Sequence, residues 1–417
     1  MLVYLEIRGV KSLEKFTLKN GIKIIYEHRD SQLTSFTIGF NAGAVEEHGF
    51  KIGTAHAVEH MVSKGTKTRT ENDINKACHK IFGFENAMTN YSYAVYFGTC
   101  LYKDFEKALD LFSDMLINPI FPEKGFREEM NIILEELKEW KDDPLQHCED
   151  MAYFNGFTKR RIKNLIIGTE ESIKSIKLDD VASFYRKFYS PDNCIIGVVS
   201  SLTFNEVVKA ADCYFGSWQN IFKEINKVVY EKNIAGIFTE KNKGANGAKI
   251  VYTFDIHDLD EKEIKALNLF NNYFGQGTNS ILYDEIRTKN GLAYDVYSKV
   301  NSDRGIDMFN IYLGTSKENV NKSINIINET IETIKSSAYT FNNGIISDLY
   351  KNMQLRMALR LENGVQLSKD LVCNELMYGN AENVYTQVKN NDDIDWEQIW
   401  KVINKVLNEP TVQIVTP

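Results

Sequence analysis

The chain has 417 residues, a formal net charge of −8, 43% hydrophobic residues and 12% aromatic residues. This composition is sufficient for a substantial hydrophobic core, and the length predicts more than one domain. Lysines and acidic residues are intermixed without a basic run, so we expect no nucleic-acid partner.

No segment approaches the ~18 uninterrupted apolar residues that a membrane-spanning helix needs. The first residues also lack the layout of a signal peptide and of an Arg-rich transit peptide. We therefore expect a cytoplasmic protein with no membrane partner.

Short β-rich runs alternate with long helical ones along the chain. Residues 21–27 and 35–41 have the pattern of strands, whereas residues 103–116 and 172–188 have the pattern of helices. This mixture predicts an α+β fold rather than a regular βαβ repeat.

The most informative segment is the decapeptide at residues 53–62, which reads Gly-Thr-Ala-His-Ala-Val-Glu-His-Met-Val. Its apolar residues have helical spacing. His56 and His60 then share one helix face and can reach one metal ion, while Glu59 projects beside them toward a bound water. The order His-x-x-Glu-His is the inverted form of His-Glu-x-x-His. A polar helix face with incidental histidines is the alternative, and two of only seven histidines falling in one pentad argue against it.

A catalytic zinc needs a third protein ligand and an open position for water. Residues 123–141 read as an amphipathic helix with an acidic flank. Periodicity leaves open which of Glu135 and Glu136 turns inward. Glu129 and Glu136 lie two turns apart on one face, so such a pair can supply one ligand and one carboxylate that orients a ligand.

The two halves of the chain share an internal repeat. The tetrapeptides at 96–99 and 312–315 both end in Gly-Thr at an offset of 216, Pro191 and Pro410 precede apolar strands at an offset of 219, and Gly65-Thr66 and Gly277-Thr278 match at 212. Near-constant offsets of this kind predict a duplicated domain.

The repeat also predicts the domain organisation. At the offset of 212, His56, Glu59 and His60 fall on Asn268, Asn271 and Asn272, which cannot supply the same chemistry. We expect a zinc-binding catalytic domain at residues 1–217, an exposed linker at 218–240 and a metal-free second domain at 241–417. Each domain should be a sandwich-like α/β unit, with a mostly antiparallel sheet flanked by helices.

Four further motifs accompany the inverted zinc motif: Ser63-Lys64-Gly65-Thr66, Asn86-Ala87-Met88-Thr89, Ile167-Gly168-Thr169-Glu170 and Tyr189-Ser190-Pro191-Asp192-Asn193. Over nearly its whole length the chain resembles the pitrilysin and insulinase type of inverzincin metallopeptidases. In that family a third ligand follows the motif by about 75 residues, and Glu136 stands 76 positions after His60. The resemblance implies one Zn²⁺ per chain, with Glu136 as the third ligand and Glu129 as the acid behind the ligands.

The resemblance also implies substrate-binding residues. The segment at 280–287, followed by Gly-Leu-Ala-Tyr at 291–294, is similar to the family's substrate-gripping pair, here Arg287 and Tyr294. These side chains can donate hydrogen bonds to a substrate carbonyl or to the developing oxyanion. Local sequence alone equally favours a surface Arg paired with Asp284 or Glu285, and a core Tyr. The family's edge strand corresponds to Glu85, Asn86, Ala87 and Met88, which would pair with an extended peptide.

The implied function is a zinc-dependent endopeptidase for unfolded or short peptides, in oligopeptide degradation or in leader-peptide maturation. A chain of this length supplies one half of the family's clamshell, so we expect a homodimer in which Arg287 and Tyr294 of one subunit serve the other subunit's zinc. Phe84 stands where the family often has a second Gly, which would narrow the approach to the edge strand. The alternative is a catalytically silent scaffold or partner subunit, and retention of both histidines, Glu59 and Glu136 disfavours it.

Overall fold

The computed structural model describes residues 13–242, 244–336, 343–386 and 394–417, apart from the side chains of Tyr294 and Asn343. The chain forms two compact units. The first comprises Met1–Leu137, Leu165–Lys227 and Met357–Gln387, and the second comprises Lys138–Asn164, Val228–Arg356 and Val388–Pro417. Among the residues described, no helix is long and apolar enough to span a membrane.

The first unit is built on a six-stranded sheet of order β1-β2-β6-β3-β5-β4. Its strands are β1 (Glu14–Thr17), β2 (Lys23–His28), β3 (Leu33–Phe40), β4 (Phe82–Thr89), β5 (Ala94–Leu101) and β6 (Cys194–Ser200). Only the β2–β6 pair is parallel. The strands predicted at 21–27 and 35–41 are confirmed as β2 and β3, and β4 lies at one edge of the sheet.

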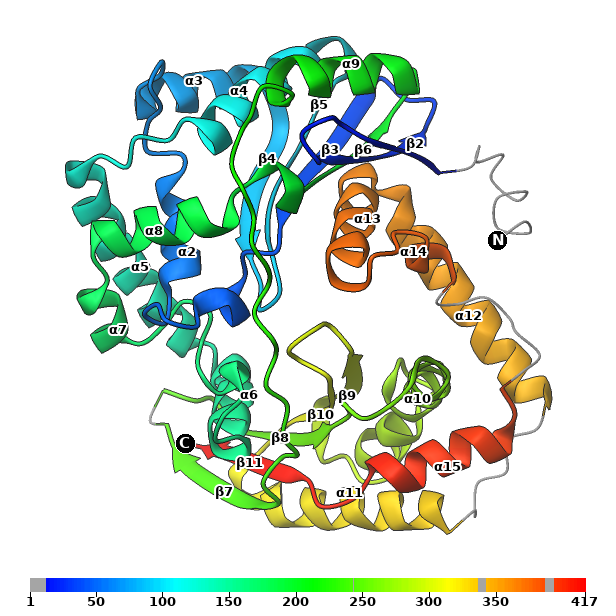
Figure 1. Cartoon of the computed structure of the whole chain (residues 1–417). Helices are drawn as coiled ribbons and strands as arrows, with labels where there is room; N and C mark the ends of the chain where they lie inside the picture. The colour runs from blue at the N-terminus through cyan, green and yellow to red at the C-terminus, as the bar shows by residue number, and fades with distance from the viewer. Residues whose placement is uncertain (1–12, 243, 337–342, 387–393) are drawn as a thin grey trace. The chain divides into compact units, whose positions relative to one another are not determined.

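Helices cover both faces of this sheet (Figure 1). They are α2 (Thr54–Met61), α3 (Glu71–Ile81), α4 (Phe105–Ile117), α5 (Glu123–Asp142), α7 (Glu170–Ser175), α8 (Leu178–Phe188), α9 (Phe204–Phe215), α13 (Gly364–Tyr378) and α14 (Asn383–Thr386). Inward residues of α2, α4, α8 and α9 form one core with the sheet. On the opposite face, Ile25, Val95 and Ile195 pack in a second core with Leu371 and Val372 of α13.

The helix expected at 103–116 is confirmed as α4, but the single helix expected at 172–188 is wrong. It is divided into α7 and α8, because the backbone of Ile176 and Lys177 is extended. The Asp180 carboxylate accepts a hydrogen bond from the Lys177 amide and so caps the new helix start. No Gly or Pro marks this break in the sequence.

The second unit has a five-stranded sheet of order β7-β11-β8-β10-β9. Its strands are β7 (Gly236–Lys241), β8 (Ala248–Asp255), β9 (Ala293–Asn301), β10 (Met308–Thr315) and β11 (Thr411–Thr416). Its helices are α6 (Pro144–Gly156), α10 (Glu261–Gly275), the π-helix η5 (Tyr283–Thr288), α11 (Val320–Lys335) and α15 (Trp396–Val406), and α12 (Asn343–Glu362) continues into the first unit. One face of the sheet packs against α10, α11 and α15, and Cys148 and Ala152 of α6 pack against the other.

The two sheets repeat one topology. Strands β2, β6, β3, β5 and β4 correspond in order to β7, β11, β8, β10 and β9, and only the first pair of each series is parallel. The matching Gly-Thr segments lie in equivalent strands, at the end of β10 and two residues before the end of β5, where Thr99 pairs with Ser35 and Thr315 pairs with Ala248. The predicted α+β fold of two homologous, mostly antiparallel domains is confirmed.

Each unit also takes helices from the other half of the sequence. Helix α6 belongs to the second unit although it precedes the repeat boundary, and α13 belongs to the first unit although it follows that boundary. The compact units therefore differ from the continuous ranges 1–217 and 241–417. A sequence repeat reports equivalent strands, whereas the assignment of a covering helix depends on which sheet buries its apolar face.

Candidate metal centre

Two histidines and one glutamate converge within the first unit. Helix α2 buries Ala55, Val58 and Met61 against the core, which places His56 and His60 together on its other side. The Glu136 carboxylate of α5 approaches both rings. Its Oε2 lies 3.8 Å from His56 Nε2 and 3.5 Å from His60 Nε2.

These three side chains fit a divalent metal ion. Their candidate ligand atoms all lie within 4.8 Å of one another, and in the described part of the chain no other set of three such residues does so. Tetrahedral zinc with bonds of about 2.1 Å holds its ligand atoms about 3.4 Å apart, close to the 3.8 and 3.5 Å that separate Glu136 Oε2 from His56 Nε2 and His60 Nε2. Two imidazoles and one carboxylate also form a donor set that suits zinc and leaves a fourth position for water.

Helix α5 resolves which of its adjacent glutamates turns inward. The helix buries Glu129, Ile133 and Leu137, so Glu136 lies on the flank facing the histidines while Glu135 is exposed. The choice that periodicity leaves open is thus made by the packing of α5.

Burial keeps the His56 imidazole neutral. Burial and, to a smaller extent, the neighbouring His60 lower the pKa of His56 to about 3. The ring centroids of the two histidines are 4.6 Å apart. His56 Nδ1 is buried without a hydrogen-bond partner among the residues described. The nitrogen that faces Glu136 is Nε2, so a metal ion bound there would leave the hydrogen of the neutral ring on Nδ1.

Three charged side chains, Glu129, Lys64 and Glu71, form a chain of contacts that begins at His60 Nδ1. The Glu129 Oε2 atom lies 2.7 Å from His60 Nδ1, and Glu129 is 3% exposed. Its other oxygen, Oε1, lies 2.5 Å from the Lys64 ammonium, which in turn contacts Glu71 at 2.7 Å. A hydrogen on Nδ1 directed at Glu129 leaves the lone pair on Nε2, the nitrogen that faces Glu136.

Glu59 is positioned by a residue outside the metal motif. Thr89, the last residue of β4, donates a short hydrogen bond from its hydroxyl to Glu59 Oε2. Burial raises the pKa of the Glu59 carboxyl, although the Thr89 hydrogen bond opposes that shift. The candidate base thus sits beside the two histidines and against the end of an edge strand.

The predicted substrate strand does lie at a sheet edge. Residues Glu85, Asn86, Ala87 and Met88 belong to β4, which pairs with β5 and with no other described strand. Glu85 and Asn86 are exposed, and Phe84 is 48% exposed. The strand runs toward Thr89 and hence toward Glu59.

The predicted Arg and Tyr pair belongs to the second unit. Arg287 lies in η5, with its guanidinium 4.9 Å from the centroid of the Tyr283 ring. Asp284 and Glu285 form ion pairs with Lys289, at 3.0 and 2.7 Å. Tyr294 lies in β9, and its side chain is outside the described residues.

Three residues that support the site were given no role from the sequence: Thr89 and Lys64, which occur in the quoted motifs, and Glu47. The Glu47 carboxylate caps α2 by accepting hydrogen bonds from the amides of Gly53 and Ala55, at 2.9 and 3.0 Å. Gly53 has a φ of 95° at this helix start, a conformation that favours glycine. Standard capping patterns place the acceptor within the first turn, so a carboxylate six residues upstream is not found by them.

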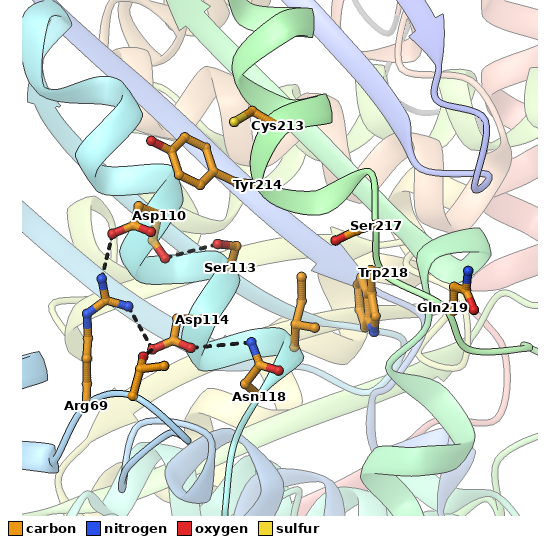
Figure 2. A pocket seen from close by; sticks show the side chains of 12 residues that line it. Arg69, Asp110, Ser113, Asp114, Asn118, Cys213, Tyr214, Ser217, Trp218 and Gln219 are labelled. Carbon is orange, nitrogen blue, oxygen red and sulfur yellow. Dashed lines mark hydrogen bonds and ion pairs between the residues drawn. The ribbon is translucent and has the colours of Figure 1, made fainter.

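A separate pocket of about 790 Å³ in the first unit contains none of the predicted site residues. Figure 2 shows Arg69 in its wall between two carboxylates, at 2.5 Å from Asp110 and 2.7 Å from Asp114. Thr66 and Thr68 donate hydrogen bonds to the same Asp114 carboxylate. These contacts bind the loop that follows α2 to helix α4.

Two family models match the chain. The model described as insulinase, peptidase family M16, matches residues 23–170, and the model described as the peptidase M16 inactive domain matches residues 175–340. The chain belongs to the insulinase family of peptidases, family M16. The predicted family is thereby confirmed.

Curated relatives of this M16 chain are named zinc proteases. An uncharacterized zinc protease of Bacillus subtilis is 26% identical over 402 residues, covering 95% of this chain and 96% of the relative. One of Streptomyces coelicolor is 24% identical over 417 residues, covering 98% and 90%. These relatives support a zinc peptidase.

Solved structures share the fold. A protease from Helicobacter pylori superposes with a TM-score of 0.86 at 20% identity, covering 97% of this chain and 100% of that one. A structure described as the peptidase M16 inactive domain from Pseudomonas fluorescens has a TM-score of 0.83 at 18% identity, with 97% of each chain covered.

The two family matches divide the chain in the same way as its candidate metal ligands do. The insulinase match contains His56, His60 and Glu136, whereas the inactive-domain match contains the equivalent asparagines. Of these, Asn268 donates to the Ile264 carbonyl, and Asn271 accepts from Ser298. Their amides are used within the fold of the second unit.

Proposed function

We propose that this M16 chain is a zinc-dependent endopeptidase of the cytoplasm that hydrolyses unfolded or short peptides. One observation carries the proposal: His56, His60 and Glu136 converge beside Glu59, and Glu59 is hydrogen-bonded to the end of an edge strand. Metal ligands, a proton acceptor and a surface for an extended peptide therefore occur together in one unit.

Zinc held by His56, His60 and Glu136, one ion per chain, would supply a water of pKa near ~7 as the nucleophile. The protein holds the ligands for this role. Glu129 fixes the His60 ring through Nδ1 and so directs Nε2 toward the metal position, and burial keeps the His56 ring neutral.

Glu59 is the proposed general base. Its carboxylate accepts a proton from the attacking water and then delivers that proton to the nitrogen of the leaving amine. Burial raises the pKa of Glu59, which suits a group that must both take and return a proton near neutral pH. The Thr89 hydroxyl holds one carboxylate oxygen, so the other is directed to the reaction.

The substrate is proposed to bind as an added strand along β4. Backbone hydrogen bonds at Glu85, Asn86, Ala87 and Met88 would read the main chain of an extended peptide, which predicts broad sequence tolerance. A folded protein has no free strand to offer and should be a poor substrate. The exposed Phe84 ring on the same strand would restrict side chains at one position.

We further propose a homodimer in which Arg287 and Tyr294 of one subunit serve the metal centre of the other. Mixing a Glu59→Gln chain with an Arg287→Ala chain tests this arrangement. The mixed dimer should contain one intact site and regain activity that neither variant has alone. Absence of any recovery would exclude action across subunits.

The competing function is a noncatalytic scaffold or partner subunit of a peptidase complex. The inactive-domain match over residues 175–340 is the observation that favours it. Against it stand the three converging metal-ligand side chains and the positioned Glu59.

Metal analysis combined with a cleavage assay distinguishes the two functions. The purified protein should contain one zinc per chain and cleave an unstructured peptide, and a chelator should abolish cleavage. The Glu59→Gln variant should keep its zinc and lose turnover. A zinc-free protein that cleaves nothing would support the scaffold, and turnover by Glu59→Gln would remove Glu59 from the mechanism.

A further inference from the structure

Lys64 occupies a constrained place behind the metal centre. It follows His60 by four residues, just beyond the end of α2, and its side chain is only 16% exposed. Its ammonium lies between two carboxylates, 2.5 Å from Glu129 and 2.7 Å from Glu71. Glu71 is the first residue of α3 and Glu129 lies in α5, so the ammonium of this loop residue joins two helices.

Glu129 uses each of its oxygens for a different partner. Oε1 faces Lys64 and Oε2 faces His60 Nδ1, while the side chain as a whole is 4% exposed. The contact at Oε1 meets the distance of an ion pair but not the geometry of a hydrogen bond. Together with the contact at Oε2 it restricts rotation of the carboxylate and so favours one position of Oε2. A buried carboxylate without a nearby cation is strongly disfavoured, and the Lys64 ammonium is the cation that the structure provides.

We propose that Lys64 is a positioning residue of the metal centre, which orients His60 for zinc through Glu129. This inference rests on the proposed zinc site and goes beyond the ligand set. Carboxylates that orient a metal-bound histidine typically alter metal affinity 10–100-fold when they are lost. Lys64 should show an effect of that kind although it touches no ligand.

The two carboxylates around Lys64 allow the orienting role to be separated from a purely structural one. Lys64→Met removes the charge but keeps an apolar stem of similar length, and Lys64→Arg keeps the charge. Lys51→Met is a matched control, because Lys51 forms a 2.9 Å ion pair with Asp180 in the same unit and has no ion pair with the metal-centre carboxylates. A structural ion pair alone predicts similar behaviour for Lys64→Met and Lys51→Met.

The test is the zinc dissociation constant of the full chain, measured by competition with a chromophoric chelator, alongside thermal unfolding of the metal-free protein. We expect Lys64→Met to weaken zinc binding about 10–100-fold, with Lys64→Arg recovering most of it and Lys51→Met binding as the parent does. Equal zinc affinity of parent and Lys64→Met overturns the inference, as does an equal loss in Lys51→Met. Lys64→Gln is measured in the same way should Lys64→Met not fold.

The zinc dissociation constant can be measured without peptide cleavage, so the experiment tests the peptidase function and the role of Lys64 separately. A parent protein that binds zinc and cleaves no peptide rejects the peptidase while the Lys64 effect is still measured. A parent that cleaves peptides but shows no Lys64 dependence of zinc affinity rejects only the positioning role.

Discussion

The Thr89 hydroxyl donates a hydrogen bond to the Glu59 carboxylate and so joins the end of the edge strand to the helix that carries both histidines. The residues are 30 positions apart in the chain. Placement of the candidate base therefore depends on the strand proposed to bind the substrate.

Replacing Thr89 by Val should lower kcat about tenfold, because one hydrogen bond to a charged group contributes about 1.5 kcal/mol. Zinc content should not change, since Thr89 contacts no ligand. Thr89→Ser restores the hydroxyl and should recover most of the rate. Steady-state kinetics on an unstructured peptide would check this, and an unchanged kcat in Thr89→Val would show that the bond does not position Glu59.

Removal of the third ligand should separate metal loss from unfolding. Glu136 is 40% exposed, so Glu136→Ala should leave the fold intact while zinc affinity falls at least about 100-fold. Glu135→Ala, on the exposed side of the same helix, is the control and should retain zinc. Elemental analysis after dialysis measures both. Zinc retained by Glu136→Ala would require another residue in the coordination sphere.

A buried ion pair should dominate the stability of the second unit. Arg160 and Asp255 are 1% and 2% exposed and lie 2.5 Å apart, and the guanidinium also lies over the Phe157 and Tyr230 rings. Arg160→Met leaves the buried Asp255 carboxylate with the partly exposed His257 ring as its remaining ion-pair partner among the described residues, and it should reduce the free energy of unfolding by about 3–5 kcal/mol. Urea denaturation measures the change. A loss below about 1 kcal/mol would mean that the existing contact with His257 satisfies Asp255 by itself.

Glu231 should make stability depend on pH in the acid range. Burial alone would raise its pKa, but hydrogen bonds from the amides of Lys159, Thr158 and Arg160 and from the Thr158 hydroxyl lower the pKa to about 2, from an ordinary value of 4.5. A carboxylate with a depressed pKa stabilises the fold above its unfolded pKa and loses that contribution as pH falls through the folded value.

Glu231→Gln should therefore cost about 1–2 kcal/mol at pH 7, and the difference from the parent should shrink below pH 4.5 and vanish near pH 2. Urea unfolding of the parent and of Glu231→Gln from pH 7 to pH 3 would measure this difference in the free energy of unfolding. A difference that stays constant over this range would contradict the assigned pKa.

Features formed by residues close together in the sequence could be predicted from it, whereas contacts between distant residues could not. The face shared by His56 and His60 is a property of one helix turn, and helix α2 forms at the predicted place. The duplication was visible because equivalent strands keep their spacing, with 216 residues between Thr99 and Thr315. The break at Ile176 and Lys177 was missed, because neither residue is a helix breaker by propensity.

The sequence by itself determined the duplication and the ligand pair on α2, which follow from fixed spacing and local periodicity, and its motifs carried the resemblance to the family. Periodicity left Glu135 and Glu136 open, the resemblance implied Glu136, and the tertiary structure places Glu136 toward the histidines. Only the tertiary structure decided that Lys64 and His60 share the Glu129 carboxylate and that Thr89 holds Glu59. Glu129 and His60 are 69 residues apart. Contacts across such distances are set by which faces of the helices and strands are buried together, and no spacing rule along the chain encodes them.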